Sequence, residues 1–327
     1  MIAPDLPAAL KATLEAKLHG QSRQDAAIRA ARISQTYRDG GTSGTITSEA
    51  DAVAYAVVRM PATYAAVAAC LNALAEARPD FGPASLLDVG AGPGTASFAA
   101  ADAFASLKSF TALDANPALR TLALELAHVD SRLSRFDYAL GAARTLLDGA
   151  VSADLVVASY MIGELAEAER SSLVDLLWAR TADTLLIVEP GTPAGYARII
   201  ALRARLIGAG AHILAPCPHD EPCPLVAPDW CHFVQRLARS RAHKQVKGAD
   251  VPFEDEKFSY VAVTRRPARQ RRPARVLAPP VVSKVAAAAK LCCADGTVRT
   301  TVIPRRDKPA FATARRWSWG DGVDPGA

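Results

Sequence analysis

The feature that most constrains this chain is a regular alternation of short apolar strands and amphipathic helices between residues 85 and 215. It begins with SLLDVG, a short apolar run that ends in a glycine-rich turn. It continues through helical stretches such as NPALRTLALELAH and buried strands such as ADLVVASYMI. Alternation of this kind is typical of parallel strands joined by right-handed helical crossovers. The pattern therefore predicts a doubly wound α/β sheet of the Rossmann type.

The first turn of this unit carries the clearest sign of a ligand. LLDVGAGPGTAS places Asp88, Gly90, Gly92 and Gly94 between a strand and a helix. Glycine lets the backbone approach a ligand closely, and the helix presents its N-terminus at the same point. The next strand ends in ALDANP, where Asp114 is placed to accept hydrogen bonds from ribose hydroxyls. The G-x-G-x-G spacing resembles motif I of class I S-adenosylmethionine-dependent methyltransferases, and NAD is the less favoured cofactor.

The acceptor side of such a site has a weaker signal. Amino methyltransferases often carry an Asn/Asp-Pro-Pro-aromatic motif after the fourth strand, where this chain has ASYMIGEL. Neither SYMIGEL nor VEPGTP contains the cysteine nucleophile that cytosine C5 methylation needs. Glu164 and Glu189 end strands near the expected pocket, and each is either a cofactor contact, a base or a hydrogen-bonded structural acid. The sequence therefore supports cofactor binding better than it supports catalysis.

A second distinctive stretch is CPHDEPCPLVAPDWCHF, which contains Cys217, Cys223 and Cys231. In a reducing compartment, such clustering favours metal ligation over disulfide bonds. A fourth ligand is needed, and the candidates are Cys292, Cys293, His219 and His232. The adjacent cysteines lie on a predicted strand, where neighbouring side chains point to opposite faces, so only one of them should reach the site. Zinc is one interpretation of this ligand set, and the absence of C-x2-C pairs favours a 4Fe–4S cluster instead.

Basic charge is concentrated in the last third of the chain. Residues 236–316 contain 20 Lys and Arg against 6 Asp and Glu, a net charge of +14, whereas the whole chain carries +5. CHFVQRLARSRAHKQVKG has the spacing of a helix with a basic stripe along one side. The stripe consists of Arg236, Arg239, His243 and Lys247, and the expected RNA-binding residues are Arg236, Arg239, Lys244 and Lys247. The charge favours a nucleic acid as a partner over a solvated basic surface without one.

The remaining segments give simpler expectations. Residues 1–80 have helical periodicity, and Pro61 is expected to break or kink the long Ala-rich stretch. RRPARQRRPAR, residues 265–275, is typical of an exposed loop, and KLCCADGTVRTTVI is typical of a hairpin with an Asp-Gly turn. No apolar run reaches the ~20 residues of a membrane helix. The first residues resemble neither a secretory signal nor a transit peptide, so we expect a cytoplasmic protein.

Several motifs together resemble one family. APCPHDEPCPL, DWCHFVQRLARSRAHKQVKG, EDEKFSYVAVTR and ARRWSWGD are similar to the methyltransferase-like family of the mitochondrial ribosomal small subunit protein twenty-two, which also has bacterial members. YAVVRMPATYAA, LLDVGAGPGTAS and SYMIGEL fit the same family. The resemblance implies a class I methyltransferase fold, association with the assembling small ribosomal subunit and, from the mitochondrial members, a 4Fe–4S cluster. Carried over by motif, the cluster ligands are Cys217, Cys223, Cys231 and Cys292, the last in preference to Cys293.

Four regions follow from these expectations. They are an N-terminal helical region (1–80), a Rossmann-like S-adenosylmethionine-binding domain (81–215), a basic region with hairpins and an iron–sulfur cluster or zinc (216–321), and a disordered tail (322–327). The expected function is an S-adenosylmethionine-dependent ribosomal RNA methyltransferase, or a methyltransferase-like factor of small-subunit assembly. The alternatives are a non-catalytic RNA-binding assembly factor with a structural metal, and a sensor that couples the state of the cluster to RNA affinity.

Overall fold

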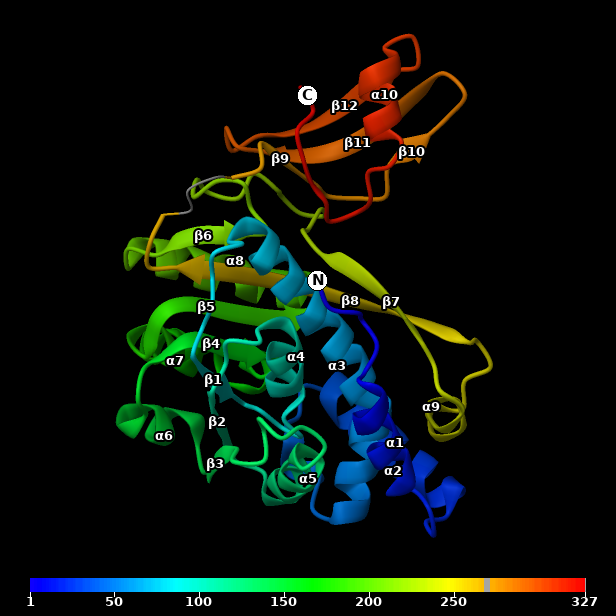
Figure 1. The fold of residues 1–327 in the computed structure, drawn as a ribbon, viewed down its shortest axis with the longest axis vertical. Coiled ribbons are helices and arrows are strands. Elements are labelled where there is room, and N and C mark those ends of the chain that lie inside the picture. Colours follow the sequence, from blue (N-terminus) through cyan, green and yellow to red (C-terminus); the bar gives the residue numbers. More distant parts are fainter. Residues whose placement is uncertain (268–270, 327) are drawn as a thin grey trace.

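A computed structural model describes residues 1–267 and 271–326, in which two sheets stand one above the other (Figure 1). The larger sheet contains eight strands. They are β1 (Ser85–Val89), β2 (Ser109–Asp114), β3 (Asp137–Leu140), β4 (Ala153–Ser159), β5 (Thr181–Pro190), β6 (His212–Ala215), β7 (Phe233–Ala238) and β8 (Phe253–Thr264). Helices connect or flank them: α4 (Thr95–Ala103), α5 (Pro117–Ala127), α6 (Ala143–Gly149), η2 (Ile162–Glu164), α7 (Glu167–Ala179), α8 (Pro193–Gly208) and α9 (Arg241–Lys247).

The strand order of this sheet is β3-β2-β1-β4-β5-β8-β6, with β7 paired to the first half of β8. Strands β1 to β5 pair in parallel, and β8 is antiparallel to β5, β6 and β7. The order reverses on either side of β1, which is the point where ligands bind in open α/β sheets. The predicted Rossmann-like architecture is thus confirmed.

The N-terminal region covers one face of this sheet. It consists of α1 (Ala8–Ala16), α2 (Arg23–Arg38), η1 (Ser43–Thr45) and the long helix α3 (Glu49–Ala77), which runs across the front of Figure 1. Of the break or kink expected at Pro61, the break does not occur, because α3 continues through this residue. Its buried residues extend from Asp51 to Leu74, so packing along nearly the whole helix offsets the hydrogen bond that proline removes.

Helix α3 also corrects the expectation about membrane segments. Within the described residues, it is the one helix with the length and hydropathy needed to cross a membrane. However, 72% of its most apolar window is buried inside the protein, as in the core helix of a globular domain.

The predicted boundary at residue 215 was wrong. Strand β8, from the region predicted to be separate, lies between β5 and β6 and pairs with both. Its residues from Phe258 to Thr264 are all buried, so this strand belongs to the core of the large sheet. The basic region is therefore not a separate unit but is partly built into the Rossmann-like sheet.

The prediction of one continuous basic helix after Cys231 was also wrong. The segment folds into β7, a connection and the short helix α9, which sits at the tip of the arm that β7 and β8 extend to the right in Figure 1. Arg236 pairs with Asp255 across the two strands, and Arg239 and Lys247 both contact Glu254. His243 is buried beside the same carboxylate. The acids of β8 decide the outcome because they neutralise the basic residues in a strand pair.

The smaller sheet has the order β10-β11-β9-β13, with β12 paired to β11. Its elements are β9 (Ala274–Val276), β10 (Val281–Val282), β11 (Ala286–Cys293), β12 (Val298–Pro304), α10 (Lys308–Ala314) and β13 (Gly322–Val323). The predicted Asp-Gly hairpin is confirmed as β11 and β12, and Gly296 at its turn has a φ of +79°.

Two expectations about the ends of this sheet need correction. The tail was predicted to be disordered from residue 322, but Gly322 and Val323 pair with β9, and Val323 is buried. Of the predicted loop 265–275, residues 268–270 lie outside the described part of the chain, and Arg275 is a buried residue of β9.

Candidate functional site

A cavity of about 260 Å³ lies at the carboxyl ends of β1, β2 and β4. Three of the five predicted cofactor residues line it, namely Gly90, Gly92 and Asp114. Further parts of its wall come from the turn after β4 and from the N-terminal region, and sequence reasoning did not assign the N-terminal region to the site.

The glycine turn approaches the cavity with its backbone. The Gly90 and Ala91 amides both donate to the Leu113 carbonyl, at 2.8 and 3.2 Å, which ties the turn to the end of β2. Gly90 has a φ of +70°, and a Cβ there would lie 2.6 Å from Cβ of Met161. Both the backbone conformation and the close packing therefore require glycine at this position.

Asp114 stands at the end of β2 and faces the same cavity. One carboxylate oxygen accepts the Gly92 amide and the other accepts the Asn116 amide, each at 2.8 Å. Burial raises the pKa of Asp114, while these backbone amides act in the opposite direction. Each carboxylate oxygen can accept a further hydrogen bond, so the carboxyl group remains able to bind ligand hydroxyls.

Asp88 and Gly94, the other two predicted cofactor residues, are not among the residues that line the cavity. The fully buried carboxylate of Asp88 accepts from the Ser97 amide at 3.0 Å and from the Ser97 hydroxyl at 2.8 Å. Burial raises the pKa of Asp88 to about 7. Gly94, with a φ of +79°, is the N-cap of α4. Both residues therefore support the conformation of the turn and do not line the cavity.

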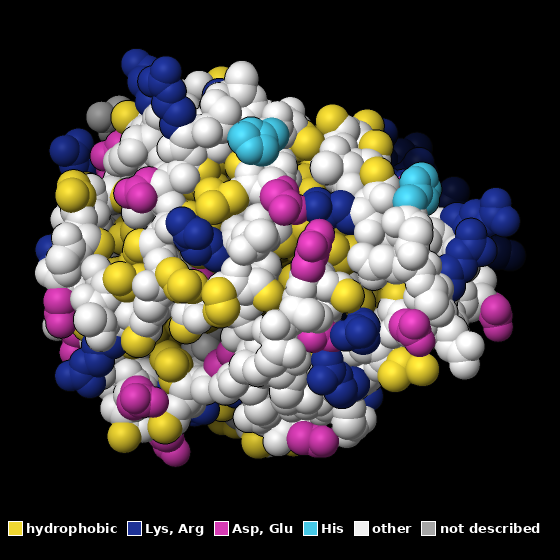
Figure 2. All heavy atoms as spheres, turned by 90° about the horizontal axis from the view of Figure 1, so that it is seen from below, with side chains coloured by type: hydrophobic (Ala, Val, Ile, Leu, Met, Phe, Trp, Pro, Cys, Tyr) yellow, Lys and Arg dark blue, Asp and Glu magenta, His cyan; other side chains and the backbone are white. Residues whose placement is uncertain are grey.

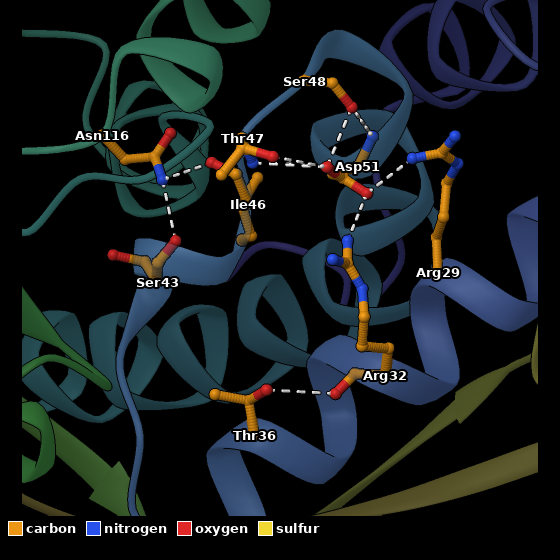
Figure 3. Close-up of polar contacts among 9 residues, drawn as sticks. All are labelled: Arg29, Arg32, Thr36, Ser43, Ile46, Thr47, Ser48, Asp51 and Asn116. Atoms are coloured by element: carbon orange, nitrogen blue, oxygen red, sulfur yellow. Dashed lines mark hydrogen bonds and ion pairs between the residues drawn. The ribbon is translucent and has the colours of Figure 1, made fainter.

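The N-terminal region forms the opposite wall through Tyr37, Ser43 and Tyr55. The Asn116 side chain donates to the carbonyls of Ser43 at 2.8 Å and Ile46 at 2.9 Å, which fastens η1 to the start of α5 (Figure 3). No local motif signals this contact, because it joins residues that are far apart in the chain.

Asp51 holds the other end of this segment (Figure 3). It accepts from Arg29 at 2.9 Å, Arg32 at 2.6 Å and the Ser48 hydroxyl at 2.8 Å. Although burial raises the pKa of Asp51, the hydrogen bonds from Arg29 and Ser48 prevail and lower it to about 2. The charged network ties α2 to the first turn of α3, and so fixes the wall of the cavity from outside.

The two glutamates singled out in the sequence have different surroundings. Glu164 lines the cavity and accepts the Ser43 amide at 3.0 Å, and burial raises its pKa to about 7. Glu189 is fully buried and pairs with Arg198 at 2.6 Å, away from the cavity. Burial raises the pKa of Glu189, and the Arg198 charge opposes that shift. Of these two glutamates, Glu164 is thus the one whose carboxyl group is available to a ligand, whereas Glu189 has a structural role.

Tyr160 occupies the acceptor side of the cavity, directly after β4. Its φ of 57° makes it the one non-glycine residue with a positive φ in the described part of the chain. Its hydroxyl donates to Glu256 at 2.9 Å, and Arg59 contacts the same carboxylate at 3.3 Å. Strained backbone of this kind persists only where surrounding contacts enforce it, and it is concentrated at functional sites.

A second cavity brings together the four predicted metal ligands. Cys217 follows β6, Cys223 lies in the connection, Cys231 precedes β7 and Cys292 is on β11, and all four line the same cavity. Cys293 instead packs in the core of the small sheet, as strand alternation predicts. The geometry thus separates the two adjacent cysteines in the expected way.

The thiols of this cavity have few polar neighbours. The Tyr196 hydroxyl lies 3.2 Å from the Cys223 sulfur, and Nε2 of His219 lies 3.3 Å from the Cys292 sulfur. Burial raises the pKa of Cys292 to about 12, and also raises the pKa values of Cys217 and Cys231. As they stand, no three His, Cys, Asp or Glu side chains of residues 1–267 and 271–326 are arranged to hold a metal ion. His232 lies elsewhere, between two tryptophan rings.

Three of the four predicted RNA-binding residues are paired with acids. Arg236, Arg239 and Lys247 are in ion pairs with acids of β8, and Lys244 lies on α9. On the face seen from below in Figure 2, Lys and Arg side chains are interspersed with acidic and apolar ones. The net charge of the segment is therefore not evidence of a continuous basic patch.

Comparison with known proteins found a matching family and several similar proteins. The sequence model of the family described as mitochondrial small ribosomal subunit Rsm22 matches residues 49–324. The human mitochondrial ribosome assembly protein METTL17 is 30% identical over an alignment of 297 residues, and the match covers 84% of this chain and 62% of that protein. The mitochondrial Rsm22-cox11 tandem protein 2 of Schizosaccharomyces pombe is 26% identical, over 82% of this chain and 42% of that protein. The chain thus spans about half the length of these relatives.

Solved structures show a more distant likeness. Magnesium protoporphyrin IX methyltransferase from Synechocystis, with bound S-adenosylmethionine, is 12% identical with a TM-score of 0.41, covering 81% of this chain and all of that one. Precorrin-6y C5,15-methyltransferase from Geobacter metallireducens is 14% identical with a TM-score of 0.39, covering 59% and 86%. At TM-scores below 0.5, these likenesses add nothing to the strand order as evidence of the fold.

Proposed function

Because the chain belongs to the Rsm22 family of the mitochondrial small ribosomal subunit, we propose that it is a methyltransferase-like factor of small-subunit assembly that binds ribosomal RNA. The human relative is named as a ribosome assembly protein, which supports this role. The relatives are named as mitochondrial, whereas our expectation for this chain remains the cytoplasm.

We further propose that the cavity after β1 binds S-adenosylmethionine. The observation that carries this proposal is the glycine turn, packed too closely for any side chain at Gly90, together with a buried Asp114 carboxylate on the same cavity. Asp114 would accept hydrogen bonds from the ribose hydroxyls, and the turn would pack against the amino-acid portion. The bound cofactor would supply an electrophilic methyl group. Glu164 would hold a negative charge close to it above pH 7, because its pKa is about 7.

A non-catalytic role is the second candidate, and one observation favours it. In place of the acceptor motif of amino methyltransferases stands Tyr160, whose hydroxyl is already engaged by Glu256. That carboxylate also binds Arg59, so the tyrosine is held in a network and is not free to act as a base. The chain would then keep the cofactor cavity and the fold as an RNA-binding platform.

We propose that Cys217, Cys223, Cys231 and Cys292 hold a 4Fe–4S cluster, with zinc as the alternative. The donor set fits a metal group, because four thiols from separate segments face one largely apolar cavity. Burial disfavours the thiolates of Cys217, Cys231 and Cys292, and a bound cation would offset that cost. The group would join the small sheet, through β11, to the end of β6 and the start of β7.

Calorimetry on the full chain tests cofactor binding. We expect S-adenosylmethionine and its demethylated product to bind, and Asp114→Ala to weaken binding by about 1–3 kcal/mol because it removes a buried acceptor. Asp154→Ala is the matched control. That carboxylate also accepts two backbone amides, of Ala84 at 2.8 Å and Ser85 at 3.1 Å, but it lies at the other end of β4. Absence of heat with both ligands would contradict the cofactor proposal.

Two further measurements separate the candidate functions. Binding of small-subunit ribosomal RNA should weaken steeply with salt, because phosphate contacts release counterions. Transfer of a labelled methyl group to that RNA would establish catalysis. RNA and cofactor binding without transfer would support the non-catalytic factor, and a chain that binds no ribosomal RNA would contradict both.

A further inference from the structure

Three aromatic rings gather where the connection before β7 meets the segment after α10. Trp230 stacks on His232, with ring centroids 4.9 Å apart and an interplanar angle of 17°. Trp319 meets the His232 ring edge-on, with ring centroids 4.8 Å apart and an interplanar angle of 79°. All three residues are only partly buried. Large aromatic side chains that remain partly exposed as a group are typical of binding surfaces.

The rings are held in place by contacts from several elements. The indole nitrogen of Trp230 donates to the Gly191 carbonyl at 3.1 Å. Between the two stacked residues, the Cys231 carbonyl accepts from the Ser259 hydroxyl at 2.8 Å. Trp319 packs against the main hydrophobic core. The Trp230 ring is thus oriented before any ligand arrives, which lowers the entropic cost of stacking on it.

The position of the rings relates them to the cofactor cavity. Gly191 directly follows β5, and its amide donates to the Lys257 carbonyl at 2.9 Å. The neighbouring strand β4 ends next to Tyr160, whose amide donates to Val188 of β5 at 2.7 Å and whose side chain lines the cavity. The rings therefore lie at the carboxyl edge of the parallel strands, one strand beyond the cavity, where an α/β sheet places its ligands.

Charge near the rings favours an anionic partner. Lys257 is exposed, and within the described residues its ammonium group makes no ion pair or side-chain hydrogen bond. Lys257 pairs with Val234 of β7, two residues after His232, and the nearby Asp229 carboxylate is paired with Lys290. A flat aromatic stack beside an ammonium group matches a nucleotide, which joins an aromatic base to a phosphate.

We propose that Trp230, His232 and Trp319 form a platform on which an unpaired RNA base stacks, with Lys257 contacting a neighbouring phosphate. This inference rests on the proposed function in RNA binding and locates the part of the site that holds a single-stranded nucleotide. The base stacks on Trp230 and extends the existing pair of rings. An RNA duplex, whose bases are already stacked on one another, does not use the platform.

The test uses the full chain and two fluorescent RNA probes, a short single-stranded oligonucleotide and a duplex of the same sequence, measured by anisotropy. We expect Trp230→Ala to weaken single-strand binding by about tenfold or more, the usual effect of losing one base–aromatic contact. Trp230→Phe keeps an aromatic face and should retain most of the affinity. Lys257→Gln should lower the slope of log affinity against log salt by roughly one contact.

Phe253→Ala is the matched control, because Phe253 is an exposed aromatic residue at the far end of β8, under the Arg236 guanidinium. Thermal unfolding shows whether each variant is folded, and Trp230→Phe decides the matter if Trp230→Ala is not. Unchanged single-strand affinity in a folded Trp230→Ala variant, or equal losses in Trp230→Phe and Trp230→Ala, would overturn the platform while leaving RNA binding intact. Failure of the unaltered chain to bind either probe would instead overturn the proposed function itself.

Discussion

The cofactor cavity and the cysteine cavity are built from different kinds of sequence information. Gly90 and Gly92 belong to one strand–turn–helix unit, and Asp114 ends the next strand. The cysteines come from three places around β6 and β7 and from a hairpin near the end of the chain. The glycine turn and Asp114 of the first site therefore come together when β1 and β2 pair, whereas the cysteines of the second meet only when both sheets are in place. This difference predicts that damage to the two sites has different consequences.

The largest expected effect is at the cysteine cavity. If the cavity holds a metal group, Cys292→Ser should abolish it and lower the unfolding temperature of the small sheet, because metal binding contributes on the order of 10 kcal/mol in small metal-stabilised domains. Cys293→Ser is the matched control, since Cys293 is the next residue and its side chain packs in the core of the same sheet. Metal analysis and visible absorption after anaerobic purification provide the measurement. Equal metal content in the two variants would contradict the assignment, and zinc without iron would select the alternative metal.

A smaller effect is expected at the glycine turn. Gly90→Ala forces an alanine into a left-handed conformation and a contact of 2.6 Å with Met161, so we expect a loss of about 2–4 kcal/mol in the free energy of unfolding and loss of cofactor binding. Gly210→Ala is the matched control, with a φ of +83° and no atom within 4 Å of the added Cβ. It should cost only about 1–2 kcal/mol and leave binding intact. Equal costs in chemical denaturation would show that the turn is not closely packed.

The smallest expected effect concerns the charge inside the cofactor cavity. The pKa of Glu164 is about 7 in the folded chain, against an ordinary value of 4.5, so the folded state binds more protons between these values. Stability of the unliganded chain should therefore fall as pH rises from about 4.5 through 7. Glu164→Gln, which can still accept the Ser43 amide, should remove this fall and add about 1–2 kcal/mol at pH 8.

Ligand binding gives the same group a second readout. Preference for the cationic S-adenosylmethionine over its uncharged-sulfur product should increase through pH 7 in the unaltered chain, and should lose this pH dependence in Glu164→Gln. Calorimetry at pH 6 and pH 8 makes the comparison. A preference that does not change with pH in the unaltered chain would show that Glu164 does not face the sulfonium.

The errors of sequence reasoning have a common origin. The segment after Cys231 has helical spacing of its basic residues, but the apolar positions Phe233 and Leu237 fit a strand face equally well, and both are buried in β7. Ion pairs with Asp255 and Glu254 on the partner strand favour the strand over the helix, and a local sequence pattern does not contain these partners. Charge counted along a sequence likewise does not reveal that much of it is paired in the folded chain.

The sequence by itself determined the parallel sheet, the glycine turn, the carboxylate at the end of β2 and the side of β11 on which each cysteine lies. These features depend on periodicity and on backbone conformation, which act over a few residues. Only the tertiary structure decided that Asp88 supports the turn from behind, that η1 closes the cofactor cavity, and that Trp319 joins Trp230 and His232. Such contacts join segments distant in the chain, and their geometry is set by how whole elements pack rather than by any local preference.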